Sequence, residues 1–330
     1  MTQLLSLVIA TKDRPDDLRQ MLKSLQNQTT PPAEIIVVDA STDPVERILR
    51  EFPNLPLIYL RHLPPSAAAQ RNAGIQACSR SATLIGFADD DIIFEAKAIE
   101  HLLRFWDNAS PDILGAAFNL LNYPQRSPSF LKSSKISEAL GLYSPRPGSV
   151  SRSGWQTVLP GLDETQFVSW LPSGAVTFRK EVFQLDLFDD FYKSYSYLED
   201  LDLSYTISRR GRLAVVADAG FSHFPSTSGR VTSFQFGRYE VRNRLHFVRK
   251  HNLSLSRCYL ALAIRLAMSA GSGIAHMNRS ALDRAFGNLL ELLLGMGRSD
   301  SNNEQRDSQQ KRPRLQPQAH QASDRLPPEE

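Results

Sequence analysis

Three consecutive carboxylates, Asp89, Asp90 and Asp91, follow the apolar run LIGFA at residues 84–88 and could bind a divalent cation. Mg²⁺ and Mn²⁺ prefer oxygen ligands, and such ions are usually held by one or two carboxylates together with substrate phosphates. Side chains two positions apart in an extended segment share a face, so Asp89 and Asp91 could bind one ion. The alternative is a solvated turn in which Asp91 precedes a helix.

A second acidic group, Glu199, Asp200 and Asp202, precedes a segment with apolar residues at helical spacing, Leu203 and Ile207. Carboxylates at a helix N-terminus are stabilised by its dipole, by about 0.3–1 kcal/mol each, and that alone could explain them. The functional alternative is a general base, a carboxylate that accepts the proton of an attacking hydroxyl as a bond forms.

Two further residues could assist such chemistry. Arg71, in the segment SAAAQRNAGIQA, can make bidentate contacts to a phosphate or a carboxylate, and the small residues around it, with Gly74, allow close backbone approach. His223, after the strand-like run LAVVADAGFS, could ligate a divalent metal or donate to a phosphate. The alternatives are an alanine-rich helix with a surface arginine and a histidine that serves the fold.

Arginines recur on one side of a predicted helix, FGRYEVRNRLHFVRKH, at Arg238, Arg242 and Arg249. At about 100° per residue, these three side chains point within about 40° of one another. The segment is therefore either a solvated basic face or a helix that offers guanidinium groups to a diphosphate or an anionic lipid head group.

The elements that must position these residues follow from the hydrophobic pattern. Short β-branched apolar runs at residues 4–10, 34–40, 55–61, 83–89 and 113–120 alternate with segments of helical period. Such alternation predicts an α/β fold with a mostly parallel, Rossmann-like sheet covered by helices on both faces. In such sheets ligands bind beyond the carboxyl ends of the strands. Thr11, Asp13, Asp39 and the three aspartates all lie at that edge.

Composition narrows the class of protein. Of 330 residues, 42% are hydrophobic and 22% charged, as in ordinary globular proteins. A formal net charge of +3 is too small to indicate a nucleic-acid partner. The two cysteines, Cys78 and Cys258, lie far apart, which excludes a disulfide scaffold and a cysteine zinc site and fits a reducing compartment.

The sequence pattern also predicts no targeting signal. The N-terminus has no basic region followed by an apolar core, and the longest apolar candidate, residues 258–275, is interrupted by Arg265. A cytoplasmic protein is expected. Contact with a membrane surface stays open, because apolar residues recur at helical spacing near the C-terminus: Leu282, Phe286, Leu289, Leu290 and Leu293.

The chain divides into three predicted parts. Residues 1–235 carry the alternating pattern, residues 236–298 form a helical extension with an apolar face of Val241, Leu245 and Val248, and residues 299–330 are polar and expected to be disordered. Within the first part, residues 123–166 are rich in Ser, Pro and Gly and predict long loops that could bind an acceptor.

Taken in order, the segments SLVIATKDRPDDL, IIVVDASTD, AAAQRNAGI, FADDDI, WLPSGAVTFRKEVF and YLEDLDLSYTISRRG resemble glycosyltransferase family 2. The resemblance covers about residues 4–249 and rests on the whole set, since each piece alone is common. It implies inverting enzymes with the nucleotide-diphospho-sugar transferase (GT-A) fold, and it implies that residues 1–235 are the catalytic domain.

The resemblance also implies a role for each matching residue. It assigns the metal to Asp89 and Asp91, and the catalytic base to Asp200, with Glu199 beside it. Nucleotide-sugar contacts are implied for Thr11, Asp13, Asp39, Arg71, Asp90 and Arg242. His223 and the RNR segment at residues 242–244 resemble features of bacterial rhamnosyltransferase-like members, and His223 is a further candidate metal ligand.

The expected chemistry is a single displacement assisted by Mn²⁺ or Mg²⁺. The partners implied are a nucleotide-diphospho-sugar donor and a saccharide or lipid-linked acceptor, in bacterial polysaccharide or glycolipid assembly. The site then lies in the cytoplasm, with contact to the inner face of the cytoplasmic membrane as the open alternative.

Two other functions remain. A sugar-nucleotide nucleotidyltransferase would usually carry a glycine-rich basic loop after the first strand, and here that position reads TKDRPDDL, without glycine. A catalytically inactive sugar-binding protein would not need intact carboxylates at Asp39, Asp89, Asp91 and Asp200.

Overall fold

The computed structural model describes residues 3–123, 134–159, 161–226, 228 and 231–297. The predicted disordered tail, residues 299–330, lies outside the described residues, as does residue 298 and part of the predicted acceptor loops, residues 124–133. The division into a catalytic domain, a helical extension and a tail therefore stays a prediction.

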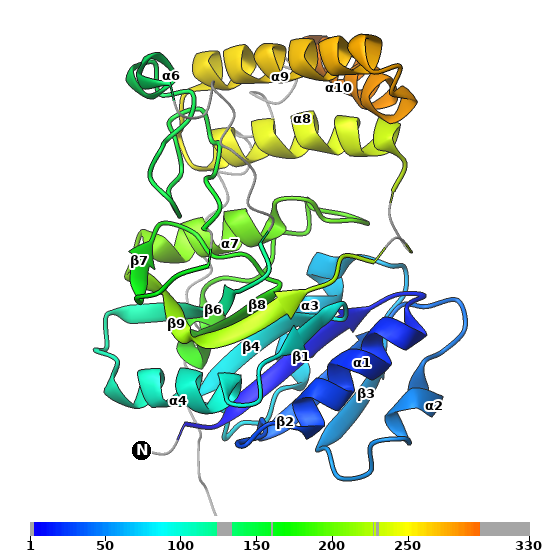
Figure 1. The fold of residues 1–330 in the computed structure, drawn as a ribbon, viewed down its shortest axis with the longest axis vertical. Helices are drawn as coiled ribbons and strands as arrows, with labels where there is room; N and C mark the ends of the chain where they lie inside the picture. The colour runs from blue at the N-terminus through cyan, green and yellow to red at the C-terminus, as the bar shows by residue number, and fades with distance from the viewer. Residues whose placement is uncertain (1–2, 124–133, 160, 227, 229–230, 298–330) are drawn as a thin grey trace, which may run out of the picture.

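A mixed sheet of nine strands forms the centre of the molecule, in the order β3-β2-β1-β4-β8-β6-β9-β5, with β7 pairing β9 beside that path (Figure 1). The strands are β1 Leu5–Thr11, β2 Glu34–Asp39, β3 Leu57–Arg61, β4 Leu84–Asp89, β5 Ile92–Phe94, β6 Ile113–Leu120, β7 Gln166–Val168, β8 Ala175–Arg179 and β9 Arg212–His223. Strands β2, β3, β4 and β6 fall within the apolar runs that predicted them, and β1 extends one residue beyond its run, to Thr11, which confirms the α/β class.

The sheet combines a parallel half and an antiparallel half. Strands β1 to β4 pair in parallel, and β6 pairs β9 in parallel. Strand β8 inserts antiparallel between β4 and β6, and β5 and β7 pair antiparallel with β9. The short strands β5 and β7 were not predicted, because each is only three residues long.

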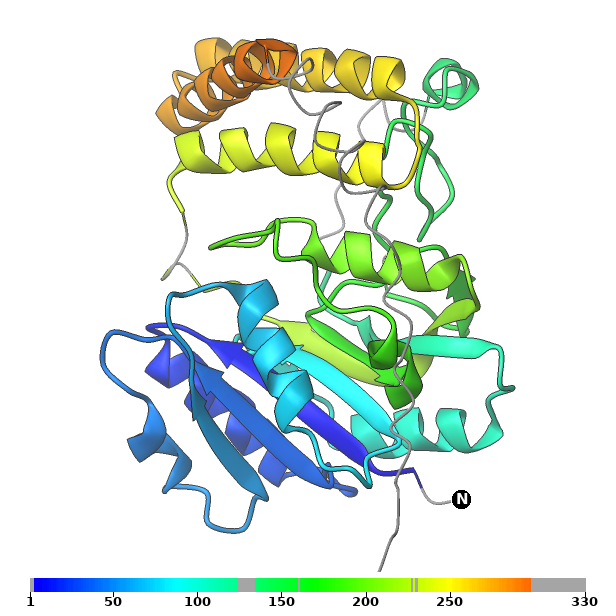
Figure 2. The same cartoon turned by 180° about the vertical axis from the view of Figure 1, so that it is seen from behind.

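Helices cover both faces of the sheet (Figures 1 and 2). They are α1 Pro15–Gln26, α2 Glu46–Leu49, α3 Ala67–Ala77, α4 Ala98–Asn108, α6 Lys135–Ala139, α7 Glu199–Ser208, α8 Ser233–Lys250, α9 Leu255–Ala275 and α10 Arg279–Gly297, with a 3-10 helix at Lys180–Gln184. Alternate residues of β1 enter different cores: Leu7 packs with α1 and α4, whereas Val8 packs with α3 and α7. A Cβ on Gly74 would lie 2.3 Å from Val8 Cγ1, so glycine there allows α3 to lie against β1.

Helices α8, α9 and α10 form a further layer on the α7 side of the sheet (Figure 1). The predicted apolar face of α8 is confirmed, because Val241, Leu245 and Val248 are buried. Helices α8 and α10 cross closely: a Cβ on Gly237 would lie 2.3 Å from Arg284 O, and one on Gly287 would lie 2.2 Å from Phe234 O.

A buried carboxylate, Glu240, ties the three C-terminal helices together. It accepts hydrogen bonds from Arg265 Nε of α9 at 3.2 Å, from Arg284 of α10 at 2.7 and 3.0 Å, and from Asn288 Nδ2 at 3.2 Å. Burial opposes ionisation, but the hydrogen bond and charge of Arg284 hold the pKa of Glu240 below 4.5. A carboxylate with a lowered pKa stabilises the fold above the unfolded pKa, and this contribution is lost as the pH falls through the folded value.

Replacing Glu240 by Gln is therefore expected to lower the free energy of unfolding at pH 7 by about 3 kcal/mol, because it leaves two half-buried guanidinium groups without their counter-charge. The difference from wild type should shrink as the pH falls below 4.5 toward the lowered folded pKa, because the wild-type carboxylate becomes protonated as the pH falls through that value. Urea unfolding at pH 7 and pH 3.5 measures both effects. The control is Glu46→Gln, since Glu46 makes an exposed i,i+4 pair with Arg50. An equal loss at both pH values would contradict this role of the charge.

Candidate active site

A cavity of about 520 Å³ opens at the carboxyl ends of β1 and β4, the edge where ligands were expected. The last residues of β9, the first turn of α7 and the start of α8 complete its wall. Eight of the predicted site residues line it: Thr11, Arg71, Asp89, Asp90, Asp91, Glu199, Asp200 and His223.

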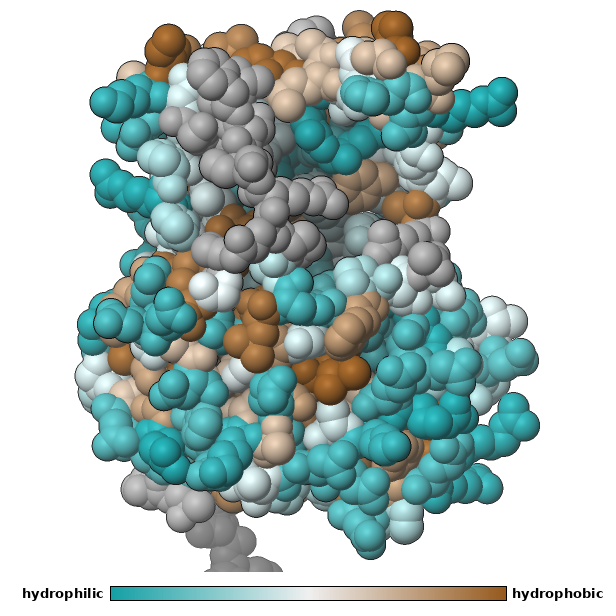
Figure 3. Space-filling view, in the orientation of Figure 1, coloured by the Kyte–Doolittle hydropathy of each residue, from teal (hydrophilic) through white to brown (hydrophobic). Residues whose placement is uncertain are grey.

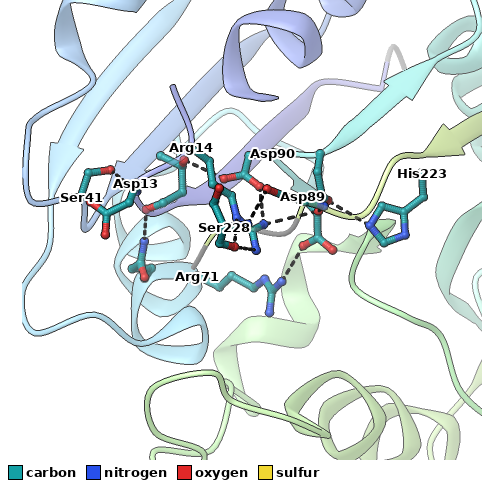
Figure 4. A network of polar contacts seen from close by, with 12 residues as sticks. Asp13, Arg14, Ser41, Arg71, Asp89, Asp90, His223 and Ser228 are labelled. Atoms are coloured by element: carbon teal, nitrogen blue, oxygen red, sulfur yellow. Dashed lines mark hydrogen bonds and ion pairs between the residues drawn. The ribbon is translucent and has the colours of Figure 1, made fainter. Parts of the chain in front are cut away.

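Asp89, Asp91 and His223 form the candidate metal site. One ligand atom from each residue lies within 4.8 Å of the others. The short strand β5 creates this arrangement, because Ile92 pairs with His223 in the β5–β9 ladder and brings the imidazole beside Asp91. His223 Nε2 lies 3.0 Å from Asp91 Oδ1, and Figure 4 shows the imidazole directed at the aspartates.

The surroundings of Asp91 favour its ionised carboxylate, the form that can bind a metal cation. Burial raises its pKa, but hydrogen bonds from His223 and from the backbone N–H of Ser226 (3.0 Å) outweigh burial and lower the pKa below its usual value. Two carboxylates and one imidazole are a donor set that suits Mn²⁺ and also offers Mg²⁺ its preferred oxygens. The residues present therefore fit a divalent cation.

The middle aspartate points into the protein. Asp90 is almost fully buried, accepts from Thr11 Oγ1 at 2.7 Å and pairs with Arg14 Nη1 at 2.9 Å. Burial raises the pKa of Asp90 to about 6, against the charge and hydrogen bonds of Arg14 and Thr11. Arg14 also reaches Asp91 Oδ2 at 3.4 Å and donates to the backbone oxygen of Ser228 (Figure 4).

Arg71 connects the two acidic groups. Its Nη2 lies 3.0 Å from Asp89 Oδ1, and its Nη1 lies 2.5 Å from Glu199 Oε1. The guanidinium is buried, and the carboxylates around it raise the Arg71 pKa despite that burial. Burial in turn raises the pKa of Glu199 to about 8, although Arg71 opposes this. Arg71 therefore fixes Glu199 relative to Asp89, a role that the sequence did not predict.

The three acids in the first turn of α7 point in two directions, toward the cavity and toward the end of α8. Glu199 and Asp200 face the cavity, whereas Asp202 is buried and pairs with Lys250 Nζ at 2.6 Å and His251 Nε2 at 2.8 Å, both at the end of α8. All three acids lie in the first turn of α7, which begins after Leu198 without a side-chain cap. The helix dipole therefore stabilises these carboxylates, and the position of Glu199 and Asp200 in the cavity wall also allows a role there.

Asp200 is held by backbone groups and stays partly open to the cavity. Its Oδ1 accepts from Leu201 N at 2.7 Å, and its Oδ2 lies 3.4 Å from Ser173 N. Burial raises the pKa of Asp200, while the Leu201 N–H and the Arg71 charge oppose the shift. A carboxylate with a raised pKa is a stronger base, provided that it remains ionised at the working pH.

Asp39 and Asp13 lie near this cavity in the chain but do not line it. Asp39 is fully buried and accepts from Ser41 N, Val45 N, Tyr59 Oη and Arg61 Nη1 at 2.7–3.0 Å. Asp13, with φ 53°, accepts from Thr42 N at 2.7 Å through Oδ1. Both carboxylates shape the loop after β2, and their predicted contacts to a nucleotide stay predictions.

The arginines of α8 do not converge on the cavity. Arg242 lies over the rings of Phe191 and Tyr239, 5.3 and 5.4 Å from their centroids, and Arg238 pairs with Glu291 at 2.9 Å. The RNR segment contributes to packing through Arg244, which is buried over Trp155. The predicted nucleotide-sugar contact of Arg242 has no support from its position.

Several cavity residues were not singled out from the sequence, namely Arg14, Gln70, Trp170, Ser173, Tyr195 and Tyr197. Only Arg14 carried a usable signal, because it follows β1 at the ligand edge together with Thr11. Of the predicted acceptor loops, Gln156 is the only described residue that lines the cavity.

Comparisons with known proteins identify a family that part of the chain resembles. Residues 6–140 match the model of glycosyl transferase family 2. A Bacillus subtilis (strain 168) protein named uncharacterized glycosyltransferase YwdF is 32% identical over 101 residues. That match covers 30% of this chain and 37% of the relative, so it spans little more than a third of that protein.

Solved structures show the fold. The mannosyltransferase PcManGT from Pyrobaculum calidifontis, in complex with GDP-Man and Mn²⁺, aligns with a TM-score of 0.52 at 15% identity over 88% of each chain. S. aureus TarS 1-349, in complex with UDP-GlcNAc, aligns with a TM-score of 0.51 at 15% identity over 82% of this chain and 75% of that one.

The fold is thus that of the GT-A glycosyltransferases. The matched segment contains Thr11, Arg71 and the three aspartates, whereas Glu199, Asp200 and His223 lie beyond it. Residues 6–140 are thus similar to glycosyl transferase family 2, and the Bacillus subtilis relative named as a glycosyltransferase supports that assignment.

Proposed function

We propose that this protein is an inverting glycosyltransferase that moves a sugar from a nucleotide-diphospho-sugar to a hydroxyl of a saccharide or lipid-linked acceptor. One observation carries the proposal: a single cavity is lined by Asp89, Asp91 and His223 and also by Asp200. The residues proposed to hold the metal for the leaving diphosphate and the carboxylate proposed as the base for the incoming hydroxyl therefore line the same cavity. The family match and the donors bound in the structural relatives support the same reaction class.

The donor's diphosphate would lie at the carboxyl ends of β1 and β4. Asp89, Asp91 and His223 would hold Mn²⁺ or Mg²⁺, which would neutralise the charge that develops on the leaving nucleoside diphosphate. Arg14 holds Asp90 and Asp91 in place, and Arg71 holds Asp89. Thr11, Asp13, Asp39 and Asp90 are proposed to position the nucleotide.

Asp200 would take the proton of the acceptor hydroxyl as its oxygen attacks the anomeric carbon from the face opposite the leaving group. One displacement inverts that centre, and no covalent intermediate is needed. Glu199 would orient this site through Arg71 rather than exchange a proton itself, because its carboxylate is paired and buried.

Replacing Asp91 by Asn tests the metal site. The concentration of Mn²⁺ needed for half-maximal stabilisation by UDP or GDP in a thermal-shift titration is expected to rise at least about 100-fold, because a ligand carboxylate is lost. Asp112→Asn is the control, since Asp112 is an exposed carboxylate paired with Arg212. If Asp91→Asn and wild type respond to Mn²⁺ alike, Asp91 does not bind the metal.

The proposed setting is the cytoplasmic side of a bacterial membrane, in polysaccharide or glycolipid assembly, with a hexosyl or deoxyhexosyl group transferred. Large apolar side chains of α9, α10 and the turn between them are exposed, among them Ile274, Met277, Phe286 and Leu293. Figure 3 shows apolar residues gathered along the upper edge, where Figure 1 places these helices. Among the described residues, α9 alone is long and apolar enough to cross a membrane by length and composition.

Peripheral contact with lipid has a direct test. Full-length protein from lysed cells should partition partly with membranes at low salt, and Phe286→Ser with Leu293→Ser should shift it to the soluble fraction. Recovery of wild type entirely in the soluble fraction at low salt would count against this contact.

The reaction itself is tested with UDP- and GDP-sugars, with and without Mn²⁺. We expect Mn²⁺-dependent release of the nucleoside diphosphate, by slow hydrolysis or by transfer to added acceptor, with an inverted anomeric centre by NMR. Pyrophosphate release from a nucleoside triphosphate and a sugar phosphate would instead identify a nucleotidyltransferase. Failure of every nucleotide sugar to bind or react would favour an inactive sugar-binding protein.

A further inference from the structure

A second cavity, of about 640 Å³, adjoins the candidate active site. It lies between the start of α8, helix α9 and the start of α10, in the C-terminal layer. Tyr195 and Val231 line both cavities, and Ser233 and Gln235, in the first turn of α8, line one each. Chain segments from the sheet layer and from the helical layer thus meet at a shared wall.

The lining of this cavity has the chemistry of a sugar site. Hydroxyl and amide groups come from Ser233, Ser269, Ser272, Ser280 and Asn278. Two aromatic rings stand beside them, Tyr195 and Phe236, with centroids 6.2 Å apart. Apolar ring faces combined with a few placed polar groups are typical of sites that bind small polar molecules.

The charge of the lining is positive. Arg265 and Arg284 are both lining residues, and none of the described lining residues is acidic. Both arginines share one carboxylate, Glu240, which leaves an excess of one positive charge. Among the described residues, the Arg265 guanidinium donates only through Nε, so its two Nη groups are available to an anionic ligand. Guanidinium groups bind phosphate and carboxylate through paired N–H donors.

Residues with strained backbone conformations form part of the wall that the two cavities share. Ser194, Ser196 and Leu198 have φ values of 60°, 54° and 78°, which non-glycine residues rarely adopt. Such conformations cost of order 1–3 kcal/mol each and persist where the surrounding structure fixes them, often at ligand sites. The Ser196 hydroxyl fixes this turn, since it donates to Tyr192 O and accepts from Ala68 N. The turn holds Tyr195 between the two cavities.

We propose that this second cavity binds the acceptor, and that it selects a saccharide that carries a phosphate or a carboxylate. The sugar would lie against Tyr195 and Phe236, the anionic group would bind Arg265, and the reacting hydroxyl would extend past Tyr195 toward Asp200. This inference rests on the proposed function and deepens it, since it names the acceptor class and places acceptor selection in α8–α10.

Binding of soluble probes tests the proposal apart from transfer. The probes are glucose 1-phosphate, glucuronic acid and methyl glucoside, measured by saturation-transfer NMR on full-length protein with saturating UDP and Mn²⁺. We expect one or both anionic probes to bind with millimolar affinity and the neutral glucoside to bind at least tenfold more weakly. A preference for glucose 1-phosphate identifies a phosphosugar, and a preference for glucuronic acid identifies an acidic sugar.

Two variants locate the binding. Ser272→Phe fills the cavity and should weaken binding of the anionic probe at least tenfold, as should Arg265→Gln, which leaves Glu240 paired with Arg284. Ala267→Phe is the matched control on the same helix, because Ala267 is exposed and does not line the cavity. Thermal unfolding checks that each variant folds.

The outcomes separate this proposal from the proposed function. Binding of UDP should be unchanged in all three variants. If neither UDP nor GDP binds, the proposed function is overturned, whereas the probe measurements still show whether the second cavity binds an anionic sugar. The second cavity is not an acceptor site if no anionic probe binds, if UDP displaces the probe, or if Ser272→Phe and Arg265→Gln both bind it as wild type does.

Discussion

Replacing Asp200 by Asn is expected to lower sugar transfer about 10³-fold, because a positioned general base contributes about 10²- to 10⁴-fold. The side chain keeps its size, and its oxygen can still accept from Leu201 N. Donor binding is proposed to depend on the metal held by Asp89 and Asp91, not on the Asp200 carboxylate. UDP or GDP affinity should therefore change by less than about threefold, equivalent to less than about 0.7 kcal/mol.

Two measurements make the Asp200 result decisive. Transfer by wild type should fall as the pH drops toward the raised pKa of Asp200, since the protonated carboxyl cannot accept a proton. Asp190→Asn is the control, because Asp190 is an exposed aspartate that does not line the cavity. Near wild-type transfer by Asp200→Asn would show that another group is the base.

The parallel half of the fold could be predicted because its signals are local. Each long strand is an apolar run of β-branched residues, and the buried face of α1, Leu18, Leu22 and Leu25, repeats at helical spacing. Strands β5 and β7 gave no such signal. Their positions depend on pairing with β9, which is more than 40 residues away from either in sequence.

The sequence pointed to candidate site residues where acidic side chains directly follow the end of a predicted strand. Asp89 and Asp91 predicted a cation site because three adjacent carboxylates are costly without a counter-charge, and that site stays a prediction. What neutralises them could not be predicted in full. Arg14, Arg71 and His223 all contribute, and each reaches the aspartates through tertiary contacts.

The partners of the three acids of α7 could not be predicted from the sequence either. Glu199, Asp200 and Asp202 look equivalent in sequence, and helical geometry alone gives no partner to any of them. The structure directs two to the cavity and turns Asp202 toward Lys250 and His251 of α8. Only the position of a distant helix makes that distinction.

Replacing Arg71 by Met should have the second large effect, on both stability and activity. Removing one partner of a buried ion pair typically costs about 3–5 kcal/mol, because the other charge is left uncompensated. Here that charge is Glu199, which ionises as the pH rises through its folded pKa of about 8 and whose carboxyl oxygen lies 2.5 Å from the Arg71 guanidinium. Asp89 also loses its partner, and a misplaced ligand of the metal should lower transfer at least about 100-fold.

The stability loss should depend on pH in a defined direction. The folded pKa of Glu199, about 8, lies above its usual value of 4.5, so the folded state binds more protons than the unfolded state between these values. Stability contributed by this proton is full below pH 4.5 and is lost as the pH rises through the folded pKa. Without Arg71 the folded pKa rises further, and ionising Glu199 becomes more costly. Arg71→Met should therefore lose more stability at pH 9 than at pH 6.

A double variant identifies Glu199 as the origin of that loss. In Arg71→Met with Glu199→Gln, no buried carboxylate remains opposite the missing guanidinium, so most of the stability at pH 9 should return. Transfer should not return, because Asp89 still lacks its partner. Urea unfolding at pH 6 and pH 9, with a donor-hydrolysis assay at pH 7.5, separates the two consequences. Equal losses at both pH values, or a double variant no more stable than Arg71→Met, would mean that packing of the Arg71 side chain, and not its charge, stabilises this part of the fold.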